Sequence, residues 1–244
     1  MDHDRIREAV ALLKQSKKTV ALTGAGVSTE SGIPDFRGKG GLWSRYDPYE
    51  YGTLGAFLNN PPKIWGMLAE LLEVVDAKPN SGHTGLANLE EMGLLAGIIT
   101  QNIDNLHQQG GSSNVLEFHG SFETFTCLSC GEKHLLQYVR ETTIPPVCRS
   151  CSEILKPDII FFDEMIPEPV LQETQELLAG TELLLVVGTS CQVQPAVHIP
   201  YQVHNNGGRI IEINLEPVLT ELAAVSLQGS FTQVVEQLVS QLQD

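Results

Sequence analysis

Basic residues are scarce in this sequence. Lys and Arg together number 15 against 30 Asp and Glu, which gives a formal net charge of −15. Proteins bind nucleic acids and anionic membranes through clusters of cationic side chains. The charge balance therefore argues against both kinds of partner and favours a basic peptide instead.

Long apolar runs are also missing. Stretches such as Leu183–Val187 and Gly97–Ile99 are far shorter than the roughly 20 residues that a membrane-spanning helix needs. The residues Asp2–Arg5 are polar, unlike the start of a signal peptide. We therefore expect a cytoplasmic protein, and 244 residues with 42% hydrophobic content suffice for one large domain with a smaller one attached.

The cysteines are too few and too unevenly spaced for a disulfide framework. There are five, an odd number, and four form the pairs Cys127-x-x-Cys130 and Cys148-x-x-Cys151, with 17 residues between the pairs. This spacing is typical of a tetrahedral four-thiolate zinc site. Four thiolates leave no open position for water, so the predicted zinc is structural. Redox-active pairs or cysteines without a ligand are the less favoured alternatives, and Cys191 is interpreted as a small buried hydrophobe.

Alternating helical and strand patterns predict a doubly wound α/β fold with a parallel sheet covered on both faces. The predicted strands are Thr19–Thr23, Ala96–Thr100, Leu183–Gly188 and Arg209–Asn214, and helices are predicted over 4–15 and 231–242. Two segments, 34–77 and 122–157, interrupt this alternation of helices and strands and are interpreted as insertions that build a second lobe. The predicted division is a Rossmann-like domain from 1–33, 78–121 and 158–244, a helical insertion at 34–77 and a zinc-binding module at 122–157.

A glycine-rich turn follows the first predicted strand. Gly24–Ser28 would put backbone N–H groups where a dinucleotide pyrophosphate binds. The fingerprint of dehydrogenases needs a third glycine where this chain has Thr29, so a hydride-transferring oxidoreductase is disfavoured. Alone, the turn is equally consistent with an ordinary strand-to-helix connection.

Further motifs follow in order along the chain. They are Gly32–Gly38, Thr100–Asp104, His119–Gly120, Gly188–Ser190 and Ile213–Leu215, with the four paired cysteines between the third and the fourth. Together with the glycine turn, these motifs resemble the sirtuin family of NAD-dependent protein deacylases, in particular its small prokaryotic deacetylases. The similarity spans residues 24 to at least 214.

The resemblance implies that NAD is bound and consumed as a co-substrate. The motifs follow predicted parallel strands, and the carboxyl ends of such strands are where these sheets bind ligands. The glycine turn and the loop after it would hold the pyrophosphate and the nicotinamide ribose, the loop after the second strand the nicotinamide, and the last loops the adenosine half. The expected cofactor residues are Gly24, Ala25, Gly26, Ser28, Thr29, Asp35, Phe36, Arg37, Gln101, Asn102, Ile103, Asp104, His119, Gly188, Thr189, Ser190, Asn214, Leu215 and Phe231.

Three residues, His119, Asn102 and Asp104, are expected to be catalytic. With an ordinary pKa of about 6.5, a neutral imidazole can accept a proton at working pH, which suits His119 to the role of general base. The resemblance implies that the acetyl-lysine oxygen attacks the nicotinamide-ribose anomeric carbon, nicotinamide leaves, and the histidine deprotonates a ribose hydroxyl. Asn102 and Asp104 would position groups and stabilise charge. The products would be the free lysine, nicotinamide and O-acetyl-ADP-ribose.

The segment Pro157–Glu164 resembles the substrate segment of the family. The resemblance implies that Ile160, Phe161 and Phe162 bind the substrate and form an apolar sleeve around the acyl-lysine stem, with Val193 on the opposite side. Acetyl-lysine proteins or peptides are therefore the expected partners, and neither nucleic acid nor a membrane is expected.

The sequence departs from its relatives at a few positions. Asp163 stands where many relatives carry Gly, which bears on peptide preference and leaves the activity in place, and Cys191 stands where Leu is commoner. Neutral variation is the favoured interpretation of both differences. Relatives that remove succinyl or malonyl groups carry a Tyr-x-x-Arg pair that aligns, from Trp65, with Leu68 and Leu71. A carboxylate buried beside two leucines would lack a partner, so acetyl or a longer apolar acyl group is favoured.

Two other functions fit parts of the sequence. Protein mono-ADP-ribosyl transfer would use the same pocket and the same anomeric carbon. A non-enzymatic zinc-binding adaptor or DNA-binding module is disfavoured, because the basic face that DNA binding needs is absent at a net charge of −15.

Overall fold

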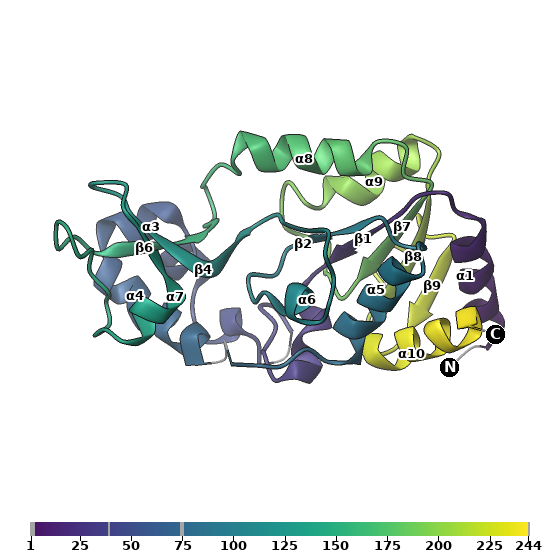
Figure 1. Ribbon diagram of the computed structural model, residues 1–244, viewed down its shortest axis with the longest axis horizontal. Coiled ribbons are helices and arrows are strands. Elements are labelled where there is room, and N and C mark those ends of the chain that lie inside the picture. The colour runs from purple at the N-terminus through teal and green to yellow at the C-terminus, as the bar shows by residue number, and fades with distance from the viewer. Residues whose placement is uncertain (1–2, 39, 74–75, 244) are drawn as a thin grey trace.

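A computed structural model describes residues 3–38, 40–73 and 76–243. Residues 1, 2, 39, 74, 75 and 244, which fall within the predicted domain ranges, lie outside the described residues. Figure 1 shows an elongated molecule with a larger α/β part at one end and a smaller lobe at the other.

The larger part is built on a six-stranded sheet in which every neighbouring pair of strands is parallel. The strand order is β3-β2-β1-β7-β8-β9, so the chain moves outward from β1 to one edge and later from β7 to the other edge. The predicted doubly wound parallel fold is thereby confirmed. The strands are β1 (Thr19–Thr23), β2 (Gly97–Thr100), β3 (Val115–Glu117), β7 (Leu183–Val187), β8 (Arg209–Asn214) and β9 (Val225–Gln228).

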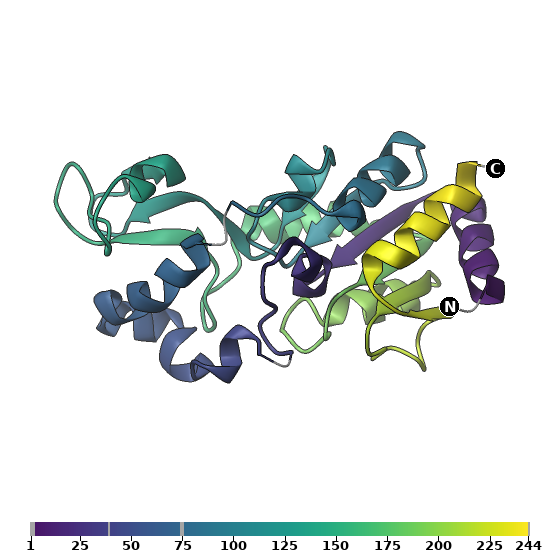
Figure 2. The ribbon, with the colours of Figure 1, turned by 90° about the horizontal axis from the view of Figure 1, so that it is seen from below.

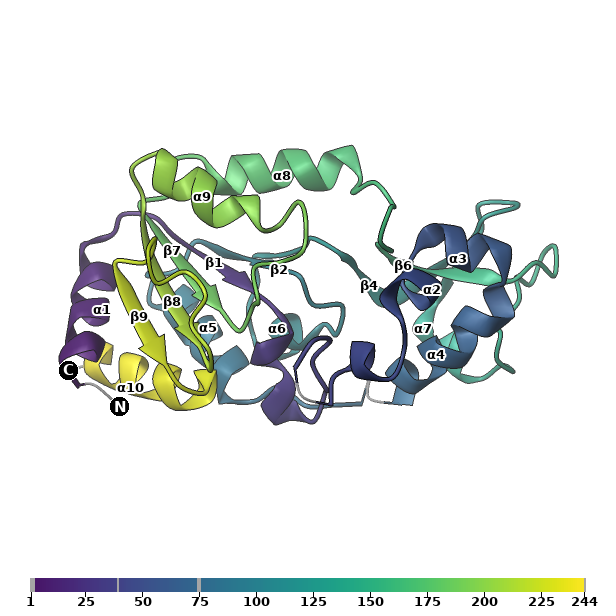
Figure 3. The same cartoon turned by 180° about the vertical axis from the view of Figure 1, so that it is seen from behind.

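Helices cover both faces of this sheet. Figures 1 and 3 show α1 (His3–Gln15), α5 (Ser81–Glu91) and α10 (Phe231–Gln243) on one face, and α8 (Glu168–Leu178) and α9 (His198–Asn205) on the other. Successive side chains of β1 alternate between the two faces. Ala21 packs in the core beneath α1, α5 and α10, while Val20 and Leu22 pack in the core beneath α8 and α9. Both faces are apolar because both are covered, which explains the unbroken burial of β1 and β7.

The first and last helices pack side by side at the end of the molecule away from the small lobe, as Figures 1 and 2 show. The apolar side chains of α10 face the sheet as predicted, with Val234, Val235 and Leu238 buried and Val239 and Leu242 packed against the same core. No helix within the described residues is both long and apolar enough to cross a membrane.

Strand prediction succeeded in the centre of the sheet and failed at its edges. β1 and β8 have the predicted bounds, whereas β7 ends one residue early because Gly188 turns into the left-handed region at φ +58. β2 begins one residue later than predicted. The edge strands β3 and β9 were not predicted, since their three and four residues form patterns too short to separate from loops.

The smaller lobe combines an antiparallel sheet with short helices. Its sheet has the order β5-β4-β6, formed by β4 (Gly120–Cys127), β5 (Lys133–Leu135) and β6 (Leu155–Ile159). Beside it lie α2 (Pro48–Tyr51), α3 (Leu54–Asn59), α4 (Pro61–Glu73) and α7 (Leu136–Arg140). The two insertions share one core, in which Trp65 of α4 stacks on Phe125 of β4 and donates a hydrogen bond to the Leu155 carbonyl of β6 at 2.8 Å.

Candidate active site

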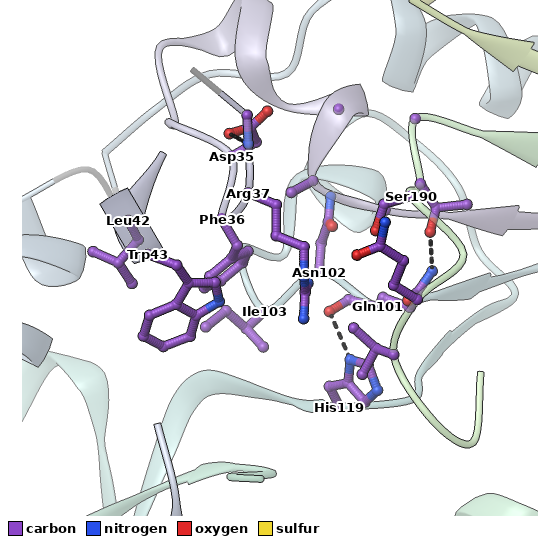
Figure 4. A pocket seen from close by; sticks show the side chains of 18 of the residues that line it. Asp35, Phe36, Arg37, Leu42, Trp43, Gln101, Asn102, Ile103, His119 and Ser190 are labelled. Atoms are coloured by element: carbon purple, nitrogen blue, oxygen red, sulfur yellow. Dashed lines mark hydrogen bonds between the residues drawn. The ribbon is translucent and has the colours of Figure 1, made fainter. Parts of the chain in front are cut away.

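A pocket of about 940 Å³ lies at the carboxyl ends of β1, β2, β7 and β8 (Figure 4). This is where the strand order reverses direction between β1 and β7, the usual ligand position in doubly wound sheets. Its lining includes the expected substrate residues, the two leucines of α4, and every expected cofactor residue except Ser28 and Asp104. Segments far apart in the sequence thus converge on one cavity.

The glycines of the first turn are required by backbone packing. Gly24 N–H donates to the Val187 carbonyl at 3.0 Å, and Gly26 N–H donates to the Gly188 carbonyl at 2.9 Å. A Cβ at Gly24 or at Gly26 would lie 2.8 Å from the Gly188 carbonyl oxygen, so any side chain there would separate the loops. The turn continues into the short 3₁₀ helices η1 (Ala25–Val27) and η2 (Thr29–Ser31), where an α-helix would follow in a dehydrogenase.

His119 lies just before β4, and its ring is oriented by the backbone of the neighbouring loop. Its Nδ1 lies 3.2 Å from the Gln101 carbonyl oxygen (Figure 4). Because a carbonyl only accepts, Nδ1 carries the proton and the lone pair of the neutral ring is on Nε2. Burial lowers the pKa of His119, the Gln101 hydrogen bond opposes this, and the cationic Arg37 lowers the pKa further. The ring is therefore held neutral, as a base requires.

Behind the pocket wall, a closed hydrogen-bond network orients Ser28. Its Oγ lies 2.6 Å from an Asp104 oxygen, 3.1 Å from Asn102 Nδ2 and 3.3 Å from His83 Nε2. Asn80 N–H donates to His83 Nδ1 at 3.2 Å, so the proton of the neutral ring is on Nε2 and points at Ser28. The Ser28 hydroxyl therefore donates to Asp104 and accepts from the other two. Ser28 and Asp104 lie outside the lining, and they hold Asn102, which lies within it.

The expected substrate segment continues directly from β6. Ile160 N–H donates to the His119 carbonyl at 2.9 Å, and Phe162 N–H donates to the Gly52 carbonyl at 2.8 Å. Side chains alternate along this extended segment, so Ile160 and Phe162 share one side. Phe161 also contributes to the lining, but it is almost fully buried and packs on Phe57 in the core of the small lobe.

Asp163 ends the segment in a left-handed conformation with φ +61. Glycine adopts this region without strain and Asp tolerates it, which accounts for the exchange of one for the other at this position. Asp163 Oδ1 accepts a hydrogen bond from Leu54 N–H at 2.9 Å, so the side chain ties the segment to α3. Cys191 also has a positive φ, of +49, and burial raises the pKa of its thiol to about 11.

The four paired cysteines converge at the tip of the small lobe. All four Sγ atoms lie within 4.8 Å of one another; the Sγ···Sγ distance is 3.4 Å between Cys127 and Cys151, and 3.6 Å from Cys130 to both Cys148 and Cys151. Four sulfurs at about 2.3 Å from a tetrahedral zinc are about 3.8 Å apart. The quartet therefore fits the predicted structural zinc.

Both cysteine pairs sit on turns of the same construction. In the first, Gly131 N–H donates to the Cys127 carbonyl at 2.8 Å and Gly131 has φ +77. In the second, Ser152 N–H donates to the Cys148 carbonyl at 3.0 Å and Ser152 has φ +64. The left-handed residue after each pair folds the chain so that both sulfurs of the pair point to one side.

Comparison with known proteins decides the family. The model of the Sir2 family matches residues 24–195. NAD-dependent protein deacylase 2 of Pyrobaculum aerophilum is 43% identical over 233 residues, which cover 95% of this chain and 93% of that protein. The chain belongs to the Sir2 family.

Other Sir2 proteins are similar over nearly the whole length. NAD-dependent protein deacetylase 1 of Pyrobaculum aerophilum is 38% identical over 243 residues, covering 98% of this chain and 95% of that protein. A solved Sir2 homologue–NAD complex is 41% identical with a TM-score of 0.90, covering 97% of this chain and 93% of that one. A Sir2–p53 peptide–NAD⁺ complex is 34% identical with a TM-score of 0.89, covering 97% and 98%.

Sequence reasoning missed two buried histidines of this Sir2 site. Besides His83, His107 of α6 (Leu106–Gln109) lies 2.9 Å through Nε2 from Thr23 Oγ1, which donates to Thr100 Oγ1 at 2.9 Å. The two rings meet edge to face at 5.0 Å. The only local signal was a capping pattern at the start of α5, with Asn80 as the N-cap residue and His83 at the third helical position. Such a pattern predicts where a helix begins and does not indicate a functional site.

Proposed function

We propose that this Sir2-family chain is an NAD-dependent protein-lysine deacetylase, which transfers the acetyl group of acetyl-lysine to ADP-ribose and releases nicotinamide. The observation that carries the proposal is the unprotonated Nε2 of a half-buried His119 at the wall of a pocket lined by every loop of the family pattern. An imidazole kept neutral at the site of an acyl transfer is suited to accept a proton from a hydroxyl.

NAD supplies the anomeric carbon and nicotinamide as a leaving group, and the residues of this chain bind and orient it. The turn after β1 and the Asp35–Arg37 loop bind the pyrophosphate and the nicotinamide ribose, with the Arg37 guanidinium offsetting phosphate charge. Gln101–Ile103 bind the nicotinamide. The loops after β7 and β8 bind the adenosine half, together with Phe231 at the start of α10.

The acetyl-lysine side chain enters between the substrate segment and the facing loop. Ile160 and Phe162 pack on one side of its aliphatic stem and Val193 on the other. His119 accepts the proton of a ribose hydroxyl at Nε2, while its Nδ1–H remains bonded to Gln101. Asn102, oriented by Ser28 and Asp104, positions the reacting end of NAD.

The zinc belongs to the small lobe and takes no part in the reaction, since four thiolates leave it no open position. We also propose the division into a Rossmann-like NAD-binding domain, a helical insertion with the cofactor loop at 34–77 and a zinc module at 122–157. A cytoplasmic location is supported by the four metal-ligand thiols, which a reducing compartment preserves.

The experiment is to incubate the purified protein with NAD⁺ and an acetyl-lysine peptide and to determine the masses of all products. We expect a peptide lighter by one acetyl group, one nicotinamide per deacetylated peptide, and ADP-ribose heavier by the same acetyl group. A peptide that gains ADP-ribose would identify a mono-ADP-ribosyltransferase instead. The unacetylated peptide with NAD⁺ is the control for acetyl-independent NAD⁺ cleavage.

A further inference from the structure

Glu212, in the middle of β8, is a fully buried acid that the proposed chemistry does not use. Its exposed fraction is 0%, and it is not part of the pocket lining. Within the described residues, no Lys, Arg or His forms an ion pair with it. A carboxyl group buried without a cation needs hydrogen-bond donors, and the donors therefore show what the group holds in place.

Two of the four donors belong to the loop that follows β8. Val218 N–H donates to Glu212 Oε1 at 2.6 Å, and Leu219 N–H donates to both carboxyl oxygens at 3.1 and 3.0 Å. The Ser226 hydroxyl, on β9, is a third donor and lies 3.3 Å from Glu212 Oε2. Leu215, Glu216 and Val218 of this loop line the pocket. The carboxyl group thus fixes the loop at Val218 and Leu219, where the chain leads on toward β9. Between β8 and β9 the loop forms no helix or strand that could hold it instead.

A second pocket loop is tied to the same group through one side chain. Asn214 Nδ2 donates to Glu212 Oε1 at 2.9 Å and to the Thr189 carbonyl at 3.1 Å. Asn214 is buried, and both Thr189 and Asn214 line the pocket. The loops after β7 and β8 therefore share one anchor, although they are separated by a helix in the sequence.

We infer that Glu212 is a positioning residue for the adenosine half of NAD, acting through the loop at 215–218 and through Asn214. The inference rests on the proposed function, which assigns the adenosine half to these two loops. Glu212 acts by accepting hydrogen bonds from the loops and does not touch the nucleotide. Its removal should weaken the binding of adenosine-containing ligands and leave the reacting end of the pocket in place.

Three substitutions at Glu212 distinguish the effect of its hydrogen bonds to the loops from the effect of its charge. Glu212→Leu has a similar size and no acceptor, Glu212→Asp keeps the charge but is one methylene too short to reach the Val218 amide, and Glu212→Gln loses the charge but keeps one acceptor oxygen. We expect the Leu and Asp variants to weaken ADP-ribose binding by about tenfold or more, measured by calorimetry, and to raise the KM for NAD⁺ equally. The kcat and the KM for the acetyl peptide should stay within about twofold, and Glu212→Gln should recover most of the affinity.

Hydrogen exchange of the Val218 and Leu219 amides gives a readout that needs no turnover, and it should accelerate in the Leu and Asp variants. Ser226→Ala removes a bond to the same carboxyl group without freeing the loop, so its ADP-ribose affinity should match wild type. If Glu212→Leu does not fold, the Asp variant carries the same expectation.

Three results would overturn the inference. The first is wild-type ADP-ribose affinity in a folded Leu or Asp variant. The second is a Gln variant as weak as the Leu variant, which would mean that charge matters and not contact. The third is a parallel loss of kcat and peptide binding, which would make Glu212 a general structural residue. Failure of the wild type itself to bind ADP-ribose or release nicotinamide would instead reject the proposed function, and the inference with it.

Discussion

At the scale of single residues, the proposed role of His119 as the base separates two steps of one reaction. Nicotinamide can leave before a base is needed, whereas product formation requires loss of a ribose hydroxyl proton. We expect His119→Ala to slow deacetylation by about 10²-fold or more, with NAD⁺ affinity largely kept and some exchange of labelled nicotinamide into NAD⁺ surviving. Deacetylation, exchange and NAD⁺ binding are measured on one acetyl peptide.

The matched control for this variant is His204→Ala, because His204 is an exposed histidine on α9. It should behave as wild type in all three assays. A His119→Ala enzyme that deacetylates at nearly the wild-type rate would exclude His119 as the base. Collapse of NAD⁺ affinity together with activity would show that the residue mainly binds or supports the pocket.

The pH dependence of the reaction should reflect the lowered pKa of His119. Burial favours the neutral ring, and the neutral ring is the active base, so activity persists below the ordinary histidine pKa of 6.5 and falls only as pH drops through the lowered value. We expect the acid limb of kcat/KM for the acetyl peptide to lie below pH 6.5. An acid limb above pH 6.5 would contradict the burial argument or point to a different base.

We expect acyl preference to depend on two single side chains as well, because Leu68 and Leu71 both line the pocket. A succinyl carboxylate would lose its water there without gaining a partner. We expect kcat/KM to be at least about tenfold higher for acetyl-lysine than for succinyl-lysine, a difference of about 1.4 kcal/mol. Equal values for the two peptides would reject the expectation.

The double variant Leu68→Tyr, Leu71→Arg tests the same preference in the opposite direction. It introduces a hydroxyl and a guanidinium able to bind the acyl carboxylate. It should reverse the preference toward the succinyl peptide.

At the scale of elements, the zinc module is continuous with the catalytic site through two strands. β4 runs from the residue after His119 to Cys127, and β6 begins three residues after the second cysteine turn and ends just before Ile160. The strands pair with each other, so a zinc ion held by the four cysteines would fix the ends of the two strands that lead to His119 and to the proposed substrate segment. The distant zinc should therefore affect catalysis through strand geometry alone.

We expect Cys148→Ser to lose zinc, unfold the small lobe and abolish activity together, because a buried ligand of a structural site is removed. Zinc content, circular dichroism and deacetylation are measured in parallel. Cys191→Ser is the matched control, since Cys191 lies outside the quartet and its variant should retain zinc. Full activity in a zinc-free Cys148→Ser protein would disprove the structural role.

At the scale of the whole molecule, the buried histidines should make the fold sensitive to acid. Burial, with a smaller contribution from the neighbouring His83, lowers the pKa of His107 to about 3, whereas in the unfolded chain it titrates at about 6.5. The unfolded state thus binds the extra proton, so this stabilising contribution is complete above pH 6.5 and is lost as pH falls toward 3.

The free energy of unfolding from urea titrations should therefore decrease below pH 6.5, with His107 alone contributing a slope of up to about 1.4 kcal/mol per pH unit. His107→Gln should show a shallower acid dependence than wild type. Identical slopes for the two proteins would mean that His107 is protonated or hydrated in the native state.

The amino-acid sequence alone determined those features of this protein that depend only on residues close together along the chain. The bounds of β1 and β8, the amphipathic face of α10 and the two cysteine turns each follow from composition and spacing within a few residues. The family motifs added His119 as the expected base, because its His-Gly pair precedes the first cysteine pair.

Only the tertiary structure decided what holds these parts in their places. The fit of Gly24 against Gly188, the link from Ser28 to His83 and the anchoring of two loops by Glu212 join segments that no local pattern relates. The physical reason is that a buried polar group needs a hydrogen-bond partner and a close backbone contact needs a second segment. Neither can be recognised from the residues next to it in the sequence. In these three cases, the partners meet near the carboxyl ends of the parallel strands.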